Sequence, residues 1–196
     1  MFWVVAELLI DHAWGYETCR MSDIKNYHSE EHSLSNGQVL MRNYSFDEAL
    51  VIVREMTDNL VLDLFEKGLV TSSLTLWIAY DHRYEHEASK GTVKLERESN
   101  SSKKIIDAVE DLYLRIADRY TGIRRIEVCA NRVAPESYVQ YSLFDDPKQT
   151  DKERHLQEAV LNVKQRYGKN AIMRGSNLLE CSTYRERNEQ IGGHRA

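Results

Sequence analysis

Residues 45–80 read SFDEALVIVREMTDNLVLDLFEKGLVTSSLTLWIAY, and this stretch contains a complete helix followed by a strand. Ser45 and Glu48 have capping-box spacing, in which the serine hydroxyl accepts a backbone N–H of the first turn and the glutamate reaches back to the serine N–H. Apolar residues then recur every three or four positions up to Gly68, a residue type that commonly follows a helix. We therefore expect an amphipathic helix that ends at Gly68 and, from strict alternation, a half-buried strand over residues 74–80.

The flanking segments continue this succession of strands and helices. Residues 34–41 predict a short strand with a break at its Ser-Asn-Gly sequence, and residues 92–96 alternate as a strand after a hairpin-length linker. Residues 102–116 predict a second amphipathic helix, and residues 125–130 predict a last strand. The order β-α-β-β-α-β is the split βαβ arrangement. The predicted fold class is α+β, with both helices on one face of a mixed sheet and helical appendages at either end of the chain.

The other face of such a sheet would lack a helical cover. Strand periodicity assigns to it the residues that alternate with the apolar ones. They form a mixed polar surface that suits solvent or a flat ligand, and they are Thr75, Trp77, Lys94, Glu96, Arg125 and Glu127.

Overall charge argues at first against a nucleic-acid partner. The chain has 196 residues, room for one ordinary domain with appendages, and a formal net charge of −5. Residues 1–89 carry 6 Lys and Arg against 15 Asp and Glu, whereas residues 90–133 carry 10 against 7. A modestly basic middle segment is thus hidden in an acidic average, and local charge is what a nearby phosphate backbone would sense.

Cysteine usage and hydropathy indicate the compartment. The three cysteines, Cys19, Cys129 and Cys181, are widely separated and suggest neither a disulfide framework nor a metal knuckle, so we expect a reducing environment. The apolar N-terminal stretch is interrupted by Glu7 and Asp11 well before it could span a membrane. We expect a cytoplasmic protein with no membrane partner.

The C-terminal third follows a different pattern. Pro135 and Pro147 bracket a stretch without helical period, and its Leu143 and Phe144 lack an evident core partner, as in a peptide ligand. A second capping box, Thr150 to Glu153, predicts the start of a helix that ends at Gly168 and leads into a polar, basic tail. The apolar side of this helix is expected to consist of Leu156, Val160, Val163 and Tyr167.

Motifs for catalysis or metal binding are weak. His82 and His86 are four residues apart in a polar connection, and His28 and His32 repeat that spacing, with no third ligand implied. A small metalloenzyme that uses His82 and His86 is kept as a hypothesis. No nucleophile elbow, Walker or dinucleotide-binding pattern occurs, and Cys129 is expected to be a small buried hydrophobe. We predict no catalytic residue and no resident metal.

An anion site is better supported at the junction between residues 92–96 and the second helix. Ser99 to Lys104 bring hydroxyls, a helix N-terminus and cations together, although an ordinary N-cap followed by surface lysines has the same sequence. We expect Arg124 and Arg125, at the start of the last strand, to lie near the same end of the sheet.

Several of these segments together resemble one family. Residues 6–15, 24–27 and 33–40 look like the thumb end, linker and first little-finger strand of Y-family translesion DNA polymerases of the UmuC/ImpB/MucB/SamB group. The resemblance continues through residues 66–70, 101–103 and 123–126 to the terminal Ile-Gly-Gly-His sequence. It implies the following division: thumb remnant and linker 1–32, little-finger DNA-binding domain 33–134, clamp-binding linker 135–150, and helix with polar tail 151–196.

The resemblance implies binding to primer-template DNA. Little fingers of this family lay the open face of their sheet in the major groove and contact phosphates without reading bases. The positions that this carries over to the present sequence are Ser35, Gln38, Lys94, Arg97, Ser101, Ser102, Lys103, Arg124 and Arg125.

Residues 140–144 are similar to the peptide by which bacterial polymerases dock on the sliding clamp. In that mode Leu143 and Phe144 fill an apolar pocket, while Gln140 orients the peptide and Ser142 occupies a variable position. Tyr141 replaces the usual leucine, which bears on affinity. The alternative is a surface loop whose Leu-Phe pair folds back on the domain.

The same resemblance sets the limits of the assignment. The palm carboxylates that hold Mg²⁺ and the nucleotide-binding fingers have no counterpart here, so the resemblance implies no cofactor in this chain, which should not polymerise alone and would act with the catalytic core of a parent polymerase. The abrupt apolar start suggests truncation through the thumb. The implied setting is error-prone lesion bypass in the SOS response, in a bacterial cytoplasm at the nucleoid. The alternative function is a protein-interaction module of a DNA-repair assembly without direct DNA contact.

Overall fold

The chain forms two separate units. A computed structural model describes residues 9–17, 19–26, 33–83, 86–137, 146–191 and 194–195. One unit spans Met1–Glu31 and the other His32–Ala196. The first unit contains the short helix α2 (Met21–Asn26), and its Trp14 side chain is 86% exposed. The elements named below belong to the second unit.

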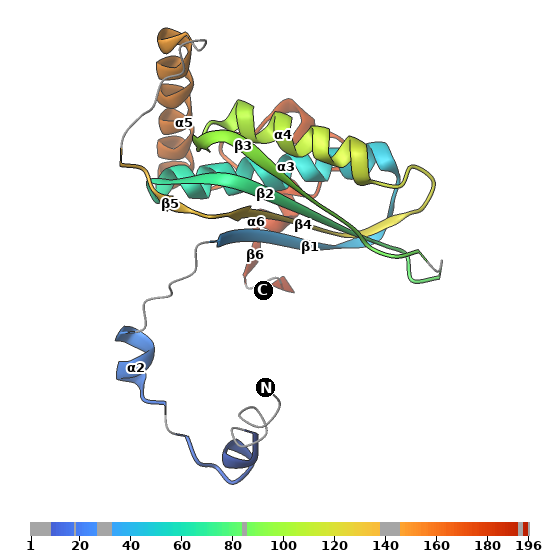
Figure 1. Cartoon of the computed structure of the whole chain (residues 1–196), viewed down its shortest axis with the longest axis vertical. Coiled ribbons are helices and arrows are strands. Elements are labelled where there is room, and N and C mark those ends of the chain that lie inside the picture. The colour runs from blue at the N-terminus through green and yellow to red at the C-terminus, as the bar shows by residue number, and fades with distance from the viewer. Residues whose placement is uncertain are drawn as a thin grey trace. The chain divides into compact units, whose positions relative to one another are not determined.

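The second unit is built on an antiparallel sheet (Figure 1). Its strands are β1 (Ser33–Tyr44), β2 (Leu69–Tyr80), β3 (Ser89–Ser99) and β4 (Ile123–Asn131), in the order β1-β4-β2-β3, and the short β5 (Ala134–Pro135) pairs with β2. The α+β class is confirmed. The expectation of a mixed sheet is wrong for the described strands, because β4 lies between β1 and β2 and pairs antiparallel with both.

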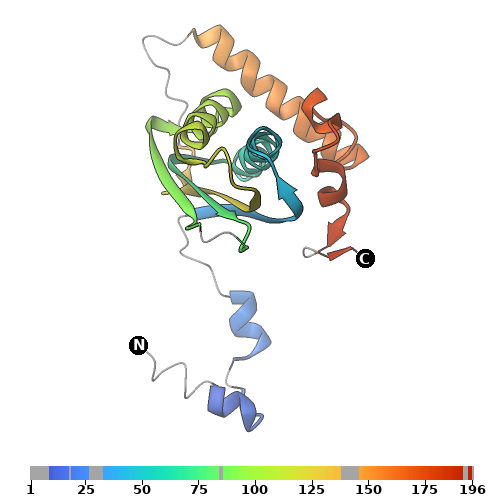
Figure 2. The ribbon, with the colours of Figure 1, turned by 90° about the vertical axis from the view of Figure 1, so that its right-hand side faces the viewer.

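Two helices cover one face of this sheet, as predicted. They are α3 (Phe46–Glu66) and α4 (Ser102–Ile116), and Figure 2 shows them side by side over the strands. Their apolar stripes pack on the inward residues of β2 and β4, and the Tyr113 hydroxyl donates a hydrogen bond of 2.7 Å to the Phe46 carbonyl. This layer fixes which side of every strand is left open.

The capping box at the start of α3 is confirmed. The Ser45 hydroxyl accepts the Glu48 N–H, and the Glu48 carboxylate accepts the Ser45 N–H at 2.9 Å. Arg42 donates to the same carboxylate, and together these contacts lower the pKa of Glu48 to about 2. The helix that the sequence places most firmly is thus also the one with a complete N-terminal cap.

The predicted break in the first strand is absent. β1 continues through Gly37 to Tyr44, and Gly37 pairs with Glu127 of β4. A Cβ atom on Gly37 would lie 3.7 Å from the Glu127 Cγ atom. That distance is an ordinary packing contact, so Gly37 continues the strand beside Glu127 and does not mark a break.

The C-terminal helix starts earlier than predicted. α5 runs from Pro147 to Tyr167 and is capped by Asp146, with proline at its first turn, where a missing N–H costs nothing. Thr150 and Glu153 therefore lie inside the helix and cannot form the predicted capping box. The end at Gly168 is confirmed, with a φ of 96°.

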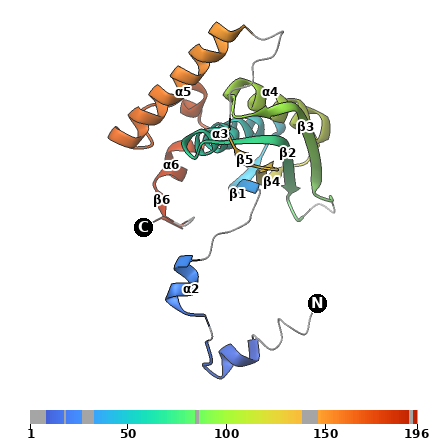
Figure 3. The same ribbon diagram turned by 60° about the vertical axis from the view of Figure 1, so that its left-hand side comes forward.

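The predicted packing face of α5 is wrong in part, because Val160 and Val163 are half-buried but the other two predicted residues are exposed. Leu156 is 64% exposed and Tyr167 is 67% exposed, whereas Gln157 is buried. The helix lies on the same side of the sheet as α3 and α4 (Figure 3), and polar side chains hold it there. An apolar period alone does not identify the docked face when hydrogen bonds determine the docking.

The remaining chain folds back on α3 and β1. It contains η1 (Gly175–Leu178), α6 (Tyr184–Asn188) and the strand pair β6 (Gln190–Ile191) and β7 (His194–Arg195). Thr183 donates its N–H to the buried Glu55 carboxylate at 3.3 Å and its hydroxyl contacts the Gln38 amide. Burial raises the pKa of Glu55. Among the described residues, no helix is long and apolar enough to cross a membrane.

Candidate nucleic-acid interface

The open face of the sheet consists of residues that lie in rows across the strands. The register aligns Ser33, Asn131, Ser73 and Lys94 in the first row and Ser35, Cys129, Thr75 and Thr92 in the second. The third row contains Gly37, Glu127, Trp77 and Lys90, and the fourth contains Val39, Arg125 and Ala79. Antiparallel partners point to the same side, so one surface carries hydroxyls, amides, cations and an indole ring.

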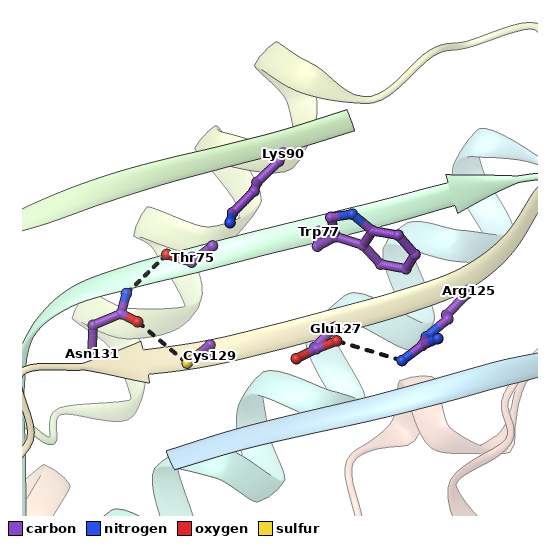
Figure 4. A pocket seen from close by; sticks show the side chains of 7 residues that line it. All are labelled: Thr75, Trp77, Lys90, Arg125, Glu127, Cys129 and Asn131. Carbon is purple, nitrogen blue, oxygen red and sulfur yellow. Dashed lines mark hydrogen bonds and ion pairs between the residues drawn. The ribbon is translucent and has the colours of Figure 1, made fainter. Parts of the chain in front are cut away.

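A shallow hollow of about 350 Å³ lies at the centre of this face (Figure 4). The Arg125 guanidinium carbon lies 5.2 Å from the centre of the Trp77 ring, within cation–π range. Its terminal nitrogen is 3.7 Å from the Glu127 carboxylate. This end of the hollow therefore combines a flat aromatic surface with one cation and one anion.

Hydroxyl and amide groups dominate the other end. The Asn131 amide donates to the Thr75 hydroxyl at 2.8 Å, and the hydroxyls of Thr75 and Thr92 are 2.9 Å apart. Cys129 was expected to be a buried hydrophobe, but it lines the hollow, and its thiol donates to the Asn131 side chain at 3.3 Å. Partial burial raises the pKa of that thiol. Cys129 follows the buried Val128 directly along β4, and successive strand residues point to opposite faces of a sheet. This alternation is the sequence signal that would have placed Cys129 on the open face.

Three of the predicted DNA contacts lie on the open face. Ser35 is exposed in the second row, Lys94 is exposed at the β3 edge of the first, and Arg125 occupies the fourth. Lys94 and Arg125 are separated by six residues of strand, roughly 20 Å along the sheet. The two cations can therefore contact a ligand at opposite ends of the face.

Three other predicted contacts are not part of these rows. Gln38 faces the helix layer, because it pairs with the buried Ile126 and its amide donates to the Thr183 hydroxyl at 3.0 Å. Arg97 is exposed in the irregular part of β3, and Arg124 is half-buried beside Arg125. Gln38 therefore presents no free amide to a ligand on the open face.

The predicted anion site at the start of α4 is filled by the chain itself. The Ser101 hydroxyl donates to both Glu153 carboxylate oxygens, at 2.9 and 3.0 Å, and the Lys103 N–H donates to one of them at 2.9 Å. Arg174 donates to the Ser102 hydroxyl at 3.0 Å. The helix N-terminus binds an anion, as expected, because a carboxylate occupies it. That carboxylate belongs to Glu153 of α5 and not to a ligand.

The expectation that Arg124 and Arg125 lie near this junction is wrong. Ser99 pairs with Thr71 at one end of β2, whereas Ile123 pairs with Tyr80 at the other end. The two basic groups are at opposite ends of the sheet, because β4 runs antiparallel to β2. The open face and the α4 N-terminus are therefore two distinct places.

Further polar contacts hold α5 at this position. Gln157 donates to the Asn100 carbonyl at 3.0 Å, and Arg154 forms a two-point ion pair with Glu136 at 2.7 and 3.2 Å. Asn100 also donates to Glu136 at 3.2 Å. Sequence reasoning missed this docking, because the partners of Glu153 and Gln157 are about fifty residues away along the chain.

Replacing Glu153 by alanine is expected to loosen α5. The substitution removes a charged acceptor from the Ser101 hydroxyl and the Lys103 N–H, so the opening free energy of α5 should fall by about 1–2 kcal/mol. Amide hydrogen exchange within α5 should accelerate at least about fivefold. Glu158→Ala, which removes an exposed carboxylate from the same helix, is the matched control and should leave exchange unchanged. Equal exchange in both variants would show that Glu153 does not hold the helix.

Residues 140–144, the predicted clamp peptide, lie outside the described residues, but their flanks are described. Glu136, just after β5, receives the Arg154 ion pair and donates its N–H to the Gly68 carbonyl at 2.8 Å. Asp146 caps α5. The flanks of the segment are thus attached to the folded unit on both sides.

The histidine pair that suggested a metal site has separate partners. His82 lies 3.6 Å from Asp81 and His86 lies 3.4 Å from Asp118. His28 and His32 lie outside the described residues. In the part of the chain that the structure describes, no group of three or more His, Cys, Asp or Glu side chains could hold a metal ion.

Comparison with known proteins assigns the sheet domain to a family. Residues 31–143 match the model of the impB/mucB/samB family C-terminal domain. The chain is 25% identical over 164 residues to a protein named DNA polymerase IV 2 of Bacillus subtilis, and 21% identical over 168 residues to one of the same name from Halalkalibacterium halodurans. The aligned regions cover 83% and 85% of this chain but only 39% and 40% of those relatives.

Solved structures with a similar arrangement were also found. One is described as a complex of beta-clamp processivity factor and little finger domain of PolIV, with 12% identity, a TM-score of 0.41, and coverage of 58% of this chain and 100% of that one. Another is a Y-family DNA polymerase chimera of Dbh and Dpo4, with 15% identity, a TM-score of 0.40, and coverage of 68% of this chain and 36% of that one.

Proposed function

Since this chain belongs to the impB/mucB/samB family through its C-terminal domain, we propose that the open face of its sheet binds primer-template DNA without reading the base sequence. In this proposal the domain acts as the little finger of an error-prone translesion polymerase in DNA repair and holds the duplex while another part of the enzyme copies it. The chain spans about 39% of the length of its B. subtilis relative, and we place polymerisation outside these residues.

One observation carries the proposal: a face without helical cover presents cations at both of its ends and hydroxyls between them. Lys94 and Lys90 lie on the β3 side, Arg125 lies on β4, and the hydroxyls of Thr75 and Thr92 lie between them. Such groups contact phosphate and sugar oxygens and position a duplex without carrying sequence information. The small number of cations predicts weak binding on its own, and a log–log salt slope that is only about 0.9 steeper for each phosphate contacted.

The proposal assigns no metal chemistry to this chain. A polymerase would use Mg²⁺ held by clustered carboxylates, and the described residues contain no cluster that fits such an ion. The role of these residues is to bind and orient DNA beside the catalytic core.

Fluorescence anisotropy with a labelled primer-template duplex tests the DNA contact. We expect binding that weakens as salt increases, and an affinity at low salt that falls about tenfold when Lys94 and Arg125 are both replaced by alanine, because the phosphate contact of Lys94 and the smaller contribution of Arg125 are both lost. Changing the duplex sequence should have little effect on the wild-type protein.

The matched control replaces Arg115 and Lys148 by alanine, since both side chains are exposed and neither is on the open face. This variant has the same net charge as the test variant. Equal losses in the two variants would indicate only a general effect of charge, and undetectable binding of the wild-type protein at low salt would contradict the proposal.

A second part of the proposal concerns residues 140–144. Their sequence, Gln-Tyr-Ser-Leu-Phe, supports docking on a sliding clamp through Leu143 and Phe144. Both flanks of the segment are attached to the folded unit, at Glu136 and at Asp146. A clamp bound there would retain the weakly binding DNA face near its substrate by raising the local concentration.

A specific observation favours a protein partner as the alternative. Val39 is 65% exposed and Met41 is 90% exposed, and both lie on β1 at the Arg125 end of the sheet. Apolar side chains contribute nothing to phosphate binding but are typical of protein contacts. Replacing both by serine should leave DNA affinity unchanged if they serve a protein partner, and should weaken it if they line the duplex.

A further inference from the structure

The centre of the open face contains an acidic side chain. Glu127 lies on β4, an inner strand, with Gly37 on one side and Trp77 on the other. Its side chain is 38% exposed. A carboxylate at this position faces the phosphates of any duplex laid across the sheet, which is unfavourable unless the carboxylate has another role.

Arg125 forms an ion pair with this carboxylate. The two residues are two positions apart on one strand, so their side chains point the same way, and their charged atoms are 3.7 Å apart (Figure 4). Trp77 stacks near the guanidinium from the neighbouring strand, at 5.2 Å. The indole ring and the carboxylate together keep Arg125 within the face.

The residues around Glu127 allow this arrangement. Gly37 has no side chain, and a Cβ atom there would be in contact with the Glu127 side chain at 3.7 Å. Across Trp77, Lys90 lies at the edge of the same row. Burial and then the Glu127 charge raise the pKa of the neighbouring Cys129 thiol, and the Lys90 charge opposes them by a smaller amount. Glu127 therefore lies at the centre of the third row, and among the described residues its ion-pair partner is Arg125 of the fourth row.

We propose that Glu127 limits the affinity of the open face for DNA by holding Arg125 in an internal ion pair. Arg125 must leave the Glu127 carboxylate to bind a DNA phosphate. The free energy of breaking the ion pair therefore offsets part of the free energy gained from the phosphate contact. This inference rests on the proposed DNA-binding function and concerns the strength of that same site.

Counterion release predicts the size of the effect. Each phosphate that a protein cation neutralises makes the slope of log K against log salt more negative by about 0.9. An arginine that is already paired contributes little to this slope. Releasing Arg125 from Glu127 should therefore add about one phosphate contact, which at 0.1 M salt corresponds to about an eightfold gain in affinity.

The experiment is anisotropy with the labelled primer-template duplex across a salt series, using the full chain with Glu127→Gln. The amide has the shape of the carboxylate, and a thermal unfolding curve verifies that the variant folds. We expect about an eightfold tighter complex at 0.1 M salt and a slope more negative by about 0.9. Glu158→Gln removes the same charge from the exposed side of α5 and should leave the slope unchanged.

A double variant, Arg125→Ala with Glu127→Gln, tests whether the effect passes through the ion pair. Its slope should match that of Arg125→Ala alone. If the gain from Glu127→Gln persists without Arg125, Glu127 acts by general repulsion and the ion-pair proposal is overturned. The ion-pair proposal is also overturned if the wild type binds DNA and Glu127→Gln has the same affinity and salt slope. If neither the wild type nor Glu127→Gln binds DNA, the proposed function itself is contradicted.

Discussion

Replacing both Leu143 and Phe144 by alanine is expected to abolish capture of the sliding clamp in a pull-down with the full chain. Apolar anchors of an extended peptide dominate its binding energy, and truncating such a residue typically costs about 2 kcal/mol or more. Two such losses correspond to an affinity decrease of about a thousandfold. The remaining contacts of residues 140–142 are too few to retain the complex.

The chain offers a matched control for this variant. Leu178 and Leu179 are also adjacent and exposed, at 68% and 52%, and they lie in the C-terminal part of the unit. Replacing both by alanine removes a comparable apolar area and should leave clamp capture intact. Capture that survives in the Leu143 and Phe144 variant, or that is lost equally in both variants, would contradict the assignment.

Tyr141 allows the same interaction to be strengthened. The docking peptides that this segment resembles have leucine at the second position, and tyrosine departs from that pattern. Tyr141→Leu should therefore increase clamp affinity, as measured by titration of the clamp against the immobilised chain. A gain in this variant alongside a loss in the alanine variant would identify residues 140–144 as the contact itself.

The largest expected effect on stability comes from Leu112 of α4. This side chain is 1% exposed and belongs to the core between the helices and the sheet. Leu112→Ala should lower the free energy of unfolding by about 2–5 kcal/mol through lost burial and the cavity that remains, as measured by urea denaturation. Leu114→Ala is the control on the same helix, because Leu114 is 46% exposed and its truncation should cost far less.

Gly91 provides an internal test of this cavity. A Cβ atom on Gly91 of β3 would lie 2.8 Å from the Leu112 Cδ1 atom, which is closer than atoms can pack. Gly91→Ala alone should therefore destabilise the fold by about 1–3 kcal/mol. In the Leu112→Ala background that contact is gone, so the same substitution should cost less. Strictly additive losses would show that α4 does not pack on Gly91 as described.

Local sequence signals predicted the sheet domain well because its elements are stabilised by local rules. The Ser45 to Glu48 capping box and the helical period after it depend on residues a few positions apart. Strand alternation likewise identified Thr75, Trp77, Arg125 and Glu127 as residues of one face. Each of these patterns is a consequence of backbone geometry and of burial on one side.

Prediction of the site was less complete because several residues have partners far away along the chain. Ser101, Ser102 and Lys103 have the composition of an anion site, but Glu153 and Arg174 of the chain already contact it. Gln38 was assigned to the DNA face, yet Thr183 holds its amide on the helix side. Neither contact has a signal in sequence spacing.

By itself the sequence determined the order of strands and helices, the apolar faces that β2 and β4 bury, and the resemblance that points to DNA. Only the tertiary structure decided that β4 lies between β1 and β2, that Arg125 and the α4 N-terminus are at opposite ends of the sheet, and that Glu127 pairs with Arg125 beside Trp77. The physical reason is the separation along the chain between the residues that interact. Periodicity and caps arise from neighbours in the chain, whereas strand order and ion pairs on a sheet depend on which distant segments the core brings together.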